Sequence, residues 1–145
     1  MILRKNVFGT PAPQGSKSFK GLSKKGRAIL AESSQAVKPW RDSVVCATRE
    51  LWGSLVWNTT IKGPVGLEIT FTVRRPKSAK EDALPDNRPD LSKLVRSTED
   101  GLTDAGVWED DARVVTCMAR KVYPGAHPDS LPVPGAVIRI RSFAL

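Results

Sequence analysis

The segment RPDLSKLVRSTEDGLTDAGVWEDDARVV, residues 88–115, predicts the centre of the fold. Apolar residues recur in it at steps of three and four, which predicts a helix over about 90–105. The inner side of this helix consists of Leu91, Leu94, Val95, Thr98 and Leu102. Gly106 provides the stop, because glycine readily adopts the left-handed conformation that ends many helices. Residues 114–122, which begin at the end of the segment, are predicted to form a strand.

Further patterns complete the secondary structure on either side of this segment. Helical spacing predicts an earlier helix that ends in the turn 58–64 and whose inner face consists of Trp40, Val44, Ala47, Leu51 and Leu55. Alternation of apolar and polar residues predicts strands over 67–73 and 136–142, and a short strand is expected over 1–9. The order β-α-β-α-β-β favours an α+β class, with one mixed sheet, two helices packed on it and a single domain over 1–145.

Two loops separate these elements. Residues 10–35 contain Gly, Pro, Ser and Lys without a sustained apolar period, which predicts a long, flexible, basic loop. Residues 74–89 are polar and contain Pro76, Pro85 and Pro89, which predicts a second loop.

The composition indicates a basic globular protein. The 145 residues are 40% hydrophobic and carry a net charge of +8, which favours a polyanionic partner over a charge that serves solubility alone. No apolar run reaches the roughly 18–20 residues that span a bilayer, and the N-terminus lacks a secretory apolar stretch. We therefore expect a cytoplasmic protein with no membrane partner. Cys46 and Cys117 lack a metal-type spacing and are predicted to be reduced core residues.

Acidic residues stand out at two places in this basic chain. Asp90 opens the second predicted helix, and Asp110 and Asp111 precede the strand that follows it. Mg²⁺ prefers carboxylate oxygens and divalent cations support phosphodiester hydrolysis, so Asp90 and Asp111 are candidate metal ligands. Alternatively, Asp90 caps the helix, and Asp110 and Asp111 are ordinary turn residues.

The distance that the chain can span decides whether Asp90 and Asp111 of one chain can form a common site. A helix of ~16 residues carries the chain ~24 Å away from Asp90. Residues 106–111, if extended at ~3.3 Å each, bring it back ~20 Å, so that Asp111 just returns to Asp90. If residues 106–111 are folded up instead, a partner subunit has to supply one of the two acids.

Arg96 is a candidate for stabilising charge on the scissile phosphate. It shares one polar helix face with Ser92 and Asp100, which lie four residues to either side. The alternative role of Arg96 is a surface ion pair with Asp100.

At these residues the sequence resembles the RusA-type Holliday junction resolvases. Residues 88–115 match the family's acidic helix start, its Asp-Ala-Leu-type helix end and its aromatic-x-Asp-Asp step before a strand, without a gap. FGTPAPQGSK at 8–17 and KPWR at 38–41 also look like members of this family from bacteriophages.

The resemblance implies a homodimeric nuclease that nicks four-way DNA junctions symmetrically with Mg²⁺, for which Mn²⁺ is a substitute. It implies functional aspartates at Asp90, Asp110 and Asp111. The family's second helix-start aspartate falls on Ser92, a candidate ligand with only a neutral hydroxyl, and its catalytic lysine falls on Arg96. We expect a protein that still cuts with a rearranged or weaker metal site; the alternative is a catalytically weakened or inactive protein that binds junctions.

Basic residues in and beside the loops are candidate DNA contacts, because lysine and arginine neutralise phosphates. Residues 10–31 contain no acid, and Phe19 is a candidate wedge for an open junction centre. The alternative is a disordered basic arm without a fixed partner. The candidates are Lys17, Lys20, Lys24, Lys25, Arg27, Arg74, Arg75, Lys77 and Lys93.

Other conspicuous residues are assigned structural roles. Residues 9–17 lack the order of a phosphate-binding loop, so no nucleotide cofactor is expected. His127 has no partners for a zinc site or a catalytic triad. An RNA-binding accessory role is a weaker option, because the sequence has no aromatic-rich strand. The tryptophans predicted to lie in the core are Trp40, Trp52, Trp57 and Trp108.

Overall fold

The computed structural model describes residues 2–15, 17–22, 28–32, 35–54 and 60–143, with only the backbone described over 17–22, 28–32 and 52–54. In this part of the chain a four-stranded sheet consists of β1 (Ile2–Phe8), β4 (Val65–Thr72), β5 (Val114–Val122) and β6 (Gly135–Ser142). The α-helices are α1 (Val37–Ser54) and α2 (Leu91–Asp104), and a 3₁₀ turn, η1 (Asp111–Arg113), precedes β5. A separate hairpin consists of β2 (Lys17–Leu22) and β3 (Ala28–Glu32).

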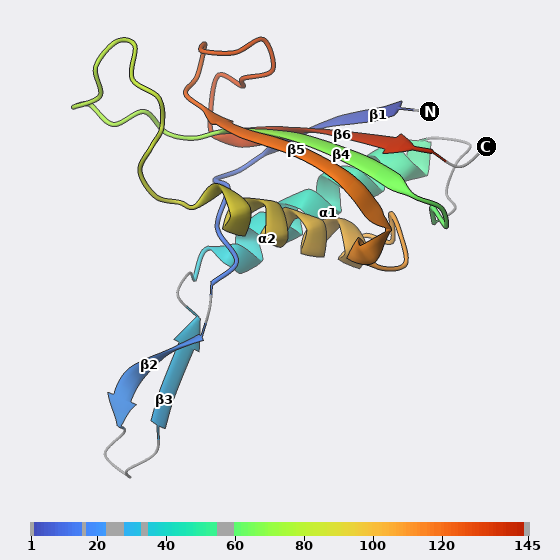
Figure 1. Cartoon of the computed structure of the whole chain (residues 1–145), viewed down its shortest axis with the longest axis horizontal. Coiled ribbons are helices and arrows are strands. Elements are labelled where there is room, and N and C mark those ends of the chain that lie inside the picture. Colours follow the sequence, from blue (N-terminus) through green and yellow to red (C-terminus); the bar gives the residue numbers. More distant parts are fainter. Residues whose placement is uncertain (1, 16, 23–27, 33–34, 55–59, 144–145) are drawn as a thin grey trace.

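The four-stranded sheet is mixed, with the strand order β1-β6-β4-β5. Strand β6 is antiparallel to β1 and β4, whereas β4 and β5 are parallel. A parallel pair needs a crossover connection, and α2 provides it. Both helices lie on the same face of the sheet, and the hairpin projects away from it (Figure 1). The α+β class predicted from the sequence is confirmed, and the six expected elements are present within a few residues of their predicted ends.

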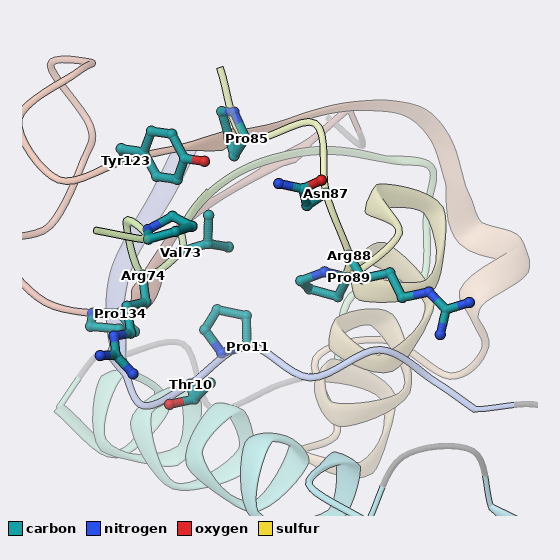
Figure 2. A pocket seen from close by; sticks show the side chains of 11 residues that line it. Thr10, Pro11, Val73, Arg74, Pro85, Asn87, Arg88, Pro89, Tyr123 and Pro134 are labelled. Carbon is teal, nitrogen blue, oxygen red and sulfur yellow. The ribbon is translucent and has the colours of Figure 1, made fainter. Parts of the chain in front are cut away.

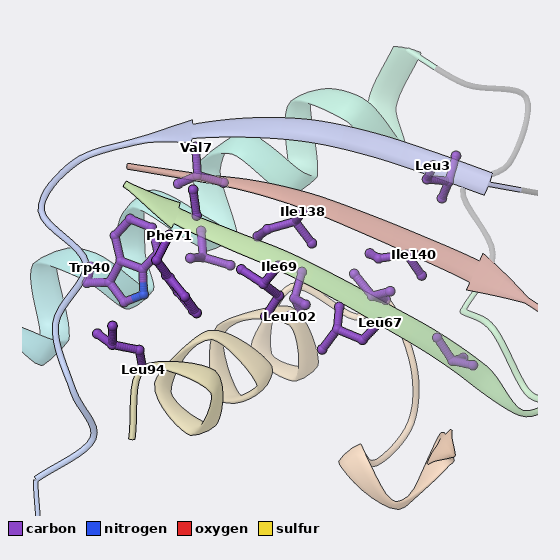
Figure 3. Close-up of a cluster of buried hydrophobic side chains, with 14 of the residues drawn as sticks. Leu3, Val7, Trp40, Leu67, Ile69, Phe71, Leu94, Leu102, Ile138 and Ile140 are labelled. Atoms are coloured by element: carbon purple, nitrogen blue, oxygen red, sulfur yellow. The ribbon is translucent and has the colours of Figure 1, made fainter. Parts of the chain in front are cut away.

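The core lies between the sheet and the helices. Alternate residues of β4 and β6 point into it, because side chains alternate along a strand (Figure 3). The ring of Trp40 in α1 packs against Phe71 with their centroids 6.5 Å apart. The labelled core side chains of Figure 3 are Leu3, Val7, Trp40, Leu67, Ile69, Phe71, Leu94, Leu102, Ile138 and Ile140. No helix in the described residues is long and apolar enough to cross a membrane.

Helices α1 and α2 are in direct contact. Gly101 permits the close approach, because a Cβ at this position would lie 3.0 Å from the side chain of Val44. In the buried interface, Nε1 of Trp40 donates a hydrogen bond to Oγ1 of Thr98 at 3.1 Å. These contacts hold α2 against α1 and therefore determine where the first residues of α2 lie.

The segment that follows β1 runs along α2. Oγ of Ser97 donates a hydrogen bond to the carbonyl oxygen of Ala12 at 2.6 Å. The backbone N–H of Gln14 donates to the carbonyl oxygen of Lys93 at 3.0 Å. The base of the β2–β3 hairpin is therefore held beside the N-terminal half of α2.

The prediction of one long loop over 10–35 is wrong. Strands β2 and β3 pair antiparallel, with Lys17 opposite Glu32 and Phe19 opposite Leu30. Neither segment shows the apolar alternation of a strand with one buried face, and the pairing is a property of the two segments together. Reading each segment alone therefore missed the hairpin.

The prediction that both cysteines lie in the core is also wrong, because Cys46 and Cys117 are exposed free thiols. Cys46 lies on the solvent side of α1, and Cys117 lies in β5 at the edge of the sheet. The apolar character of a cysteine does not by itself decide burial when the element containing it has an open side.

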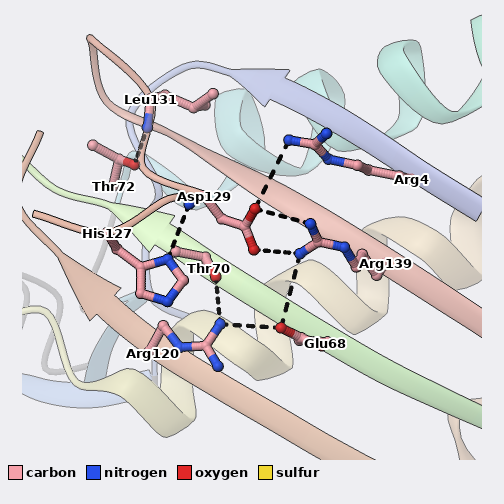
Figure 4. A network of polar contacts seen from close by, with 9 residues as sticks. All are labelled: Arg4, Glu68, Thr70, Thr72, Arg120, His127, Asp129, Leu131 and Arg139. Carbon is pink, nitrogen blue, oxygen red and sulfur yellow. Dashed lines mark hydrogen bonds and ion pairs between the residues drawn. The ribbon is translucent and has the colours of Figure 1, made fainter. Parts of the chain in front are cut away.

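The face of the sheet opposite the helices bears a charged network (Figure 4). Arg139 donates two hydrogen bonds to Asp129, one of them at 2.8 Å, and Arg4 lies 3.9 Å from the same carboxylate. Arg120 donates to Glu68 at 3.1 Å. The hydrogen bonding from Arg139 is the main cause that lowers the pKa of Asp129 below its ordinary value. This network joins the strands of the sheet to the loop between β5 and β6.

Candidate active site

Asp90 immediately precedes α2 and keeps its carboxylate available to solvent. Its backbone carbonyl accepts hydrogen bonds from the N–H groups of Lys93 and Leu94, both at 3.1 Å, but its side chain makes no capping hydrogen bond. The alternative role as a side-chain N-cap is therefore not the one observed. The carboxylate is 56% exposed and lies 3.6 Å from Nζ of Lys93. It can bind a ligand without uncapping the helix.

Asp90 lines one of two adjoining hollows at the N-terminal end of α2. The hollow containing Asp90 has a volume of about 540 Å³ and is also lined by Arg88 and Lys93. The second hollow, of about 180 Å³, shares Arg88 and adds Arg74 (Figure 2). A carboxylate among cations in a groove suits the binding of a phosphate together with a metal ion.

Lys121 fixes the chain that leads to Asp90. Its Nζ donates hydrogen bonds to the carbonyl oxygens of Asn87 at 2.7 Å and Pro89 at 2.9 Å. Because Lys121 lies near the end of β5, these bonds tie the loop before α2 to the edge of the sheet. Lys121 is a positioning residue for Asp90.

Asp111 lies at the other end of α2. Its Oδ1 accepts a hydrogen bond from Oγ1 of Thr103 at 3.1 Å, and the same hydroxyl oxygen accepts one from Nε1 of Trp108 at 2.8 Å. Trp108 is only 1% exposed, which confirms its predicted place in the core and anchors this chain of bonds. The Asp110 carboxylate accepts a hydrogen bond from the N–H of Ala112 at 2.7 Å and thus caps η1, as its alternative turn role predicts.

The acidic residues near Asp111 crowd one another. Burial is the largest cause that raises the pKa of Glu99, and the negative charges of Asp111 and Asp100 raise it further. Burial also raises the pKa of Asp100, while the nearby Arg41 opposes this effect. The upward pKa shifts of Glu99 and Asp100 therefore come first from burial and second from the neighbouring negative charges.

Asp90 and Asp111 do not meet within one chain. Helix α2 contains 14 residues, so Thr103 lies about 20 Å along the axis from Asp90. Residues 106–111 do not return along the helix, because Asp111 is hydrogen-bonded to Thr103. In the described ranges no three His, Cys, Asp or Glu side chains are grouped closely enough to hold a metal ion. Of the two arrangements expected from the sequence, the extended return of residues 106–111 to Asp90 is not observed, and the folded arrangement is.

A protein-family comparison decides the class of this chain. The model described as endodeoxyribonuclease RusA matches residues 9–131, which include both acidic positions. The chain belongs to the RusA endodeoxyribonuclease family. It is therefore a structure-specific nuclease of a family that resolves Holliday junctions, with branched DNA as its substrate class. Nucleases of this family generally depend on a divalent metal. No curated protein matches the chain.

Ser92 and Arg96, which the sequence resemblance marks as departures from the family pattern, are both exposed on α2 of this RusA-family nuclease. They lie four residues apart and share one helix face. Among the described residues Arg96 forms no salt bridge with Asp100, although its charge favours the ionised form of that carboxyl group and so lowers its pKa. The alternative role of Arg96 as an ion-pair partner of Asp100 is therefore absent, and its guanidinium is available to a phosphate.

The predicted DNA contacts outside the hairpin differ in their surroundings. Arg74 is exposed and lines the smaller hollow of the RusA-family nuclease, and Lys93 lines the larger one. Lys77 is exposed in the loop after β4. Arg75, in contrast, donates a hydrogen bond to the carbonyl oxygen of Lys80, and its guanidinium lies 5.1 Å over the ring of Tyr123. Arg75 therefore stabilises its own loop.

Several predictions fall on residues whose side chains are not described. Lys17 and Lys20 lie in β2, where only the backbone is described, and Lys24, Lys25 and Arg27 lie outside the described residues. The side chain of Trp52 and all of Trp57 also lie outside them. His127 lies in the loop after β5, where its Nδ1 accepts a hydrogen bond from the N–H of Asp129 at 3.0 Å.

Sequence reasoning missed the residues that orient the two aspartates. Thr103 is an unremarkable polar position in a helix, and Lys121 is one of several cations in a basic strand. Their roles depend on neighbours that the fold brings together, so no local spacing indicates them.

Proposed function

We propose that this RusA-family nuclease is a Mg²⁺-dependent homodimer, able to use Mn²⁺, that resolves four-way DNA junctions by paired symmetric nicks. The observation that carries the proposal is the carboxylate of Asp90, which is exposed in a basic hollow and not used to cap its helix. Its surroundings combine a hard oxygen ligand with cations for the phosphate.

The side chains at the proposed site suit a hard divalent cation. Asp90 and Asp111 offer carboxylate oxygens, and Ser92, two residues after Asp90, has a neutral hydroxyl. When bound, the ion would polarise the phosphate and stabilise the charges that develop on the attacking and leaving oxygens. Thr103 orients Asp111, and Lys121 holds the backbone just before Asp90. Arg96 would hold the scissile phosphate by hydrogen bonds.

A dimer gives this site its second acid. Because the two aspartates lie at opposite ends of α2, each site would take Asp90 from one subunit and Asp111 from the other. A four-way junction has approximate two-fold symmetry, so two equal sites would address opposed strands. Paired nicks follow from this symmetry.

The basic groove would guide a DNA strand toward Asp90. Arg74 and Arg88 line the smaller hollow, and Lys93 lies beside Asp90 in the larger one. The hairpin, with Lys17 and other cations in its sequence, emerges beside the same end of α2 and would contact the junction arms. Such phosphate contacts read the shape of the branch more than its base sequence.

A labelled synthetic four-way junction tests the proposal. We expect the wild type to nick opposed strands with Mg²⁺ and not with EDTA, and Asp111→Asn to bind the junction without nicking it. Asp82→Asn is the matched control, because it removes the same charge from an exposed position in the loop between β4 and α2. A wild type that binds junctions but nicks them with no divalent ion would leave only a junction-binding protein.

A further inference from the structure

The smaller hollow, which adjoins the hollow of Asp90, is lined mainly by apolar groups. Its volume of about 180 Å³ is below the roughly 300–1,000 Å³ of sites for drug-sized ligands, so it suits a single small ring system. Proline rings form much of its wall (Figure 2). A charged ligand would lose its hydration against such a wall, so an uncharged one is favoured. The apolar residues that line the hollow are Pro11, Val73, Pro76, Pro85, Pro89 and Pro134.

Two uncharged polar groups point into the smaller hollow from opposite sides. Tyr123 is only 3% exposed, and its hydroxyl and the carboxamide of Asn87 point toward one another across the hollow (Figure 2). Neither group forms a hydrogen bond with a described residue. The hydroxyl of a buried tyrosine usually has a hydrogen-bond partner, so these two groups indicate a ligand with a polar edge.

Both polar groups are held in place by contacts outside the hollow. The backbone carbonyl of Asn87 accepts a hydrogen bond from Nζ of Lys121 at 2.7 Å, which leaves the carboxamide free. The guanidinium of Arg75 lies 5.1 Å over the ring of Tyr123. The hydrogen-bonding groups are therefore preorganised, and preorganisation lowers the entropy cost of binding a ligand.

The cations of the smaller hollow lie at its rim. Arg74 and Arg88 are exposed, and their guanidinium groups point away from the hollow in different directions (Figure 2). Neither arginine forms a salt bridge with a described residue. The phosphates of one nucleic-acid strand can therefore contact the two arginines while an uncharged part of the same strand enters the hollow.

We propose that the smaller hollow binds one unpaired nucleobase of the strand that is cut, close to the scissile phosphate. The proposal rests on the proposed function, since it assigns a second part of the substrate to the site of Asp90. A nucleobase is flat and uncharged, and its edge is polar. Its faces pack on the proline rings, and Asn87 and Tyr123 form hydrogen bonds with its edge, as asparagine side chains do when they read a base.

The position of the hollow limits which base it binds. Asn87 lies three residues before Asp90, so their Cα atoms are at most about 10 Å apart. Pro11, Arg88 and Pro89 line both hollows, which places the two side by side. Successive nucleotides of a duplex strand rise about 3.4 Å, so the base belongs to a nucleotide within about three positions of the scissile phosphate. Because the fold fixes this separation, the base changes the rate of nicking and not its distance from the crossover.

A base-binding hollow also favours branched DNA over a continuous duplex. Taking a base out of a duplex costs the free energy of its stacking and pairing. Where a strand leaves its helix at a crossover, a base has lost a stacking neighbour, so this cost is lower. A continuous duplex bears the full cost. The hollow therefore selects substrates by how easily a base is unpaired, in addition to the phosphate contacts that read the shape of the branch.

The fluorescence of 2-aminopurine tests whether a base enters the hollow, because the emission of this base analogue rises when it leaves the stack. Four-way junctions carry the analogue at successive positions on both sides of the crossover. Binding of the full chain is followed in EDTA, so that no strand is cut. We expect the emission to rise at least about twofold at one position, and to rise less in the matching continuous duplex. No rise at any position would overturn the proposal.

Substitution of the two polar groups tests whether the base unstacks into this hollow. Asn87→Ala removes the carboxamide and keeps the backbone carbonyl that Lys121 contacts, and Tyr123→Phe removes only the hydroxyl. At saturating protein we expect each variant to reduce the rise and the double variant to abolish it. Asn6→Ala is the matched control, because it removes the same group from an exposed position in β1. A rise that persists in the double variant would overturn the proposal.

Nicking rates provide a second readout. Each of the four bases is placed at the position that the fluorescence identifies, and nicking is measured with Mg²⁺. We expect the rates of the wild type to differ at least about tenfold between the best and the worst base, and those of the double variant to differ less than about threefold. Arg74→Ala should weaken binding equally for all four bases, because it removes a phosphate contact. A base preference that survives in the double variant would contradict the proposal.

The two readouts separate this proposal from the proposed function. The fluorescence in EDTA requires binding but no nicking. A rise that depends on Asn87 and Tyr123, in a protein that never nicks junctions, would support the base-binding hollow and reject the proposed function. A nuclease whose fluorescence signal and base preference both ignore these substitutions would reject the base-binding hollow alone.

Discussion

Two inactive variants of this nuclease should regain activity when they are mixed. Asp90→Asn and Asp111→Asn each remove one carboxylate from both proposed sites of a homodimer. In a mixed dimer, one site loses both carboxylates and the other keeps both, because each site takes Asp90 from one subunit and Asp111 from the other. Mixing therefore recreates one complete site per mixed dimer.

The size of the recovery follows from the geometry. Within one chain the two acids lie at opposite ends of α2, about 20 Å apart, whereas Mg²⁺ binds oxygen at about 2.1 Å. One chain therefore cannot complete a site alone. Random exchange makes about half of the dimers mixed, each with one complete site of two, so about a quarter of the wild-type sites return. Each variant alone should nick at least about a hundredfold more slowly than the wild type.

The assay uses two differently tagged variants. They are mixed in equal amounts, subunit exchange is verified by capture on one tag, and a labelled four-way junction is added with Mg²⁺. We expect nicks at about a quarter of the wild-type rate, mostly in one strand for each binding event. Verified mixed dimers that nick no faster than the separate variants would refute the shared site.

Three further predictions concern neighbouring residues. Ser92→Asp should increase Mg²⁺ affinity and nicking rate by adding a charged ligand, and an unchanged Mg²⁺ requirement and rate would show that Ser92 is not at the metal. Thr103→Val should leave the buried N–H of Trp108 without its acceptor, lowering the free energy of unfolding by about 1–3 kcal/mol and slowing nicking; an unaltered Tm would contradict this. Because Arg139 lowers the pKa of Asp129, the ionised carboxylate stabilises the fold above the ordinary value of about 3.9 and loses this effect as pH falls through the lower folded pKa. The difference in urea unfolding between wild type and Asp129→Asn should therefore shrink below about pH 4, and a constant difference would show that this ion pair does not stabilise the protein.

Periodicity predicted those elements that bury one face. Leu94 and Leu102 lie on the side of α2 that packs on the sheet, and alternation placed Ile69 and Ile138 in the core. These positions can be predicted from the sequence because an element with one buried face repeats apolar residues at the period of a helix or a strand. The same reasoning placed Asp90 at the start of α2, and Asp110 and Asp111 just before the strand that follows it.

Features that depend on partners distant in sequence could not be predicted in this way. The β2–β3 pairing joins two segments without a clear repeat, and Cys117 is exposed because its strand lies at the edge of the sheet. Capping propensity favoured a side-chain N-cap for Asp90, yet the side chain makes no such bond. The contact of Asp111 with Thr103 became apparent only when residues 106–111 were seen to fold against the helix.

The hydrogen bonds from Ser97 to Ala12 and from Gln14 to Lys93 make α2 the common support of the hairpin and of Asp90. If the hairpin grips the junction at its branch, it holds the branch at a set spacing from the cutting carboxylate. The distance between the hairpin and Asp90 then determines where the strand is cut. We therefore expect the nicks to fall a constant number of nucleotides from the crossover, whatever bases flank it. Lengthening the chain between Gln14 and β2 should make the distance between nick and crossover variable before it abolishes cutting.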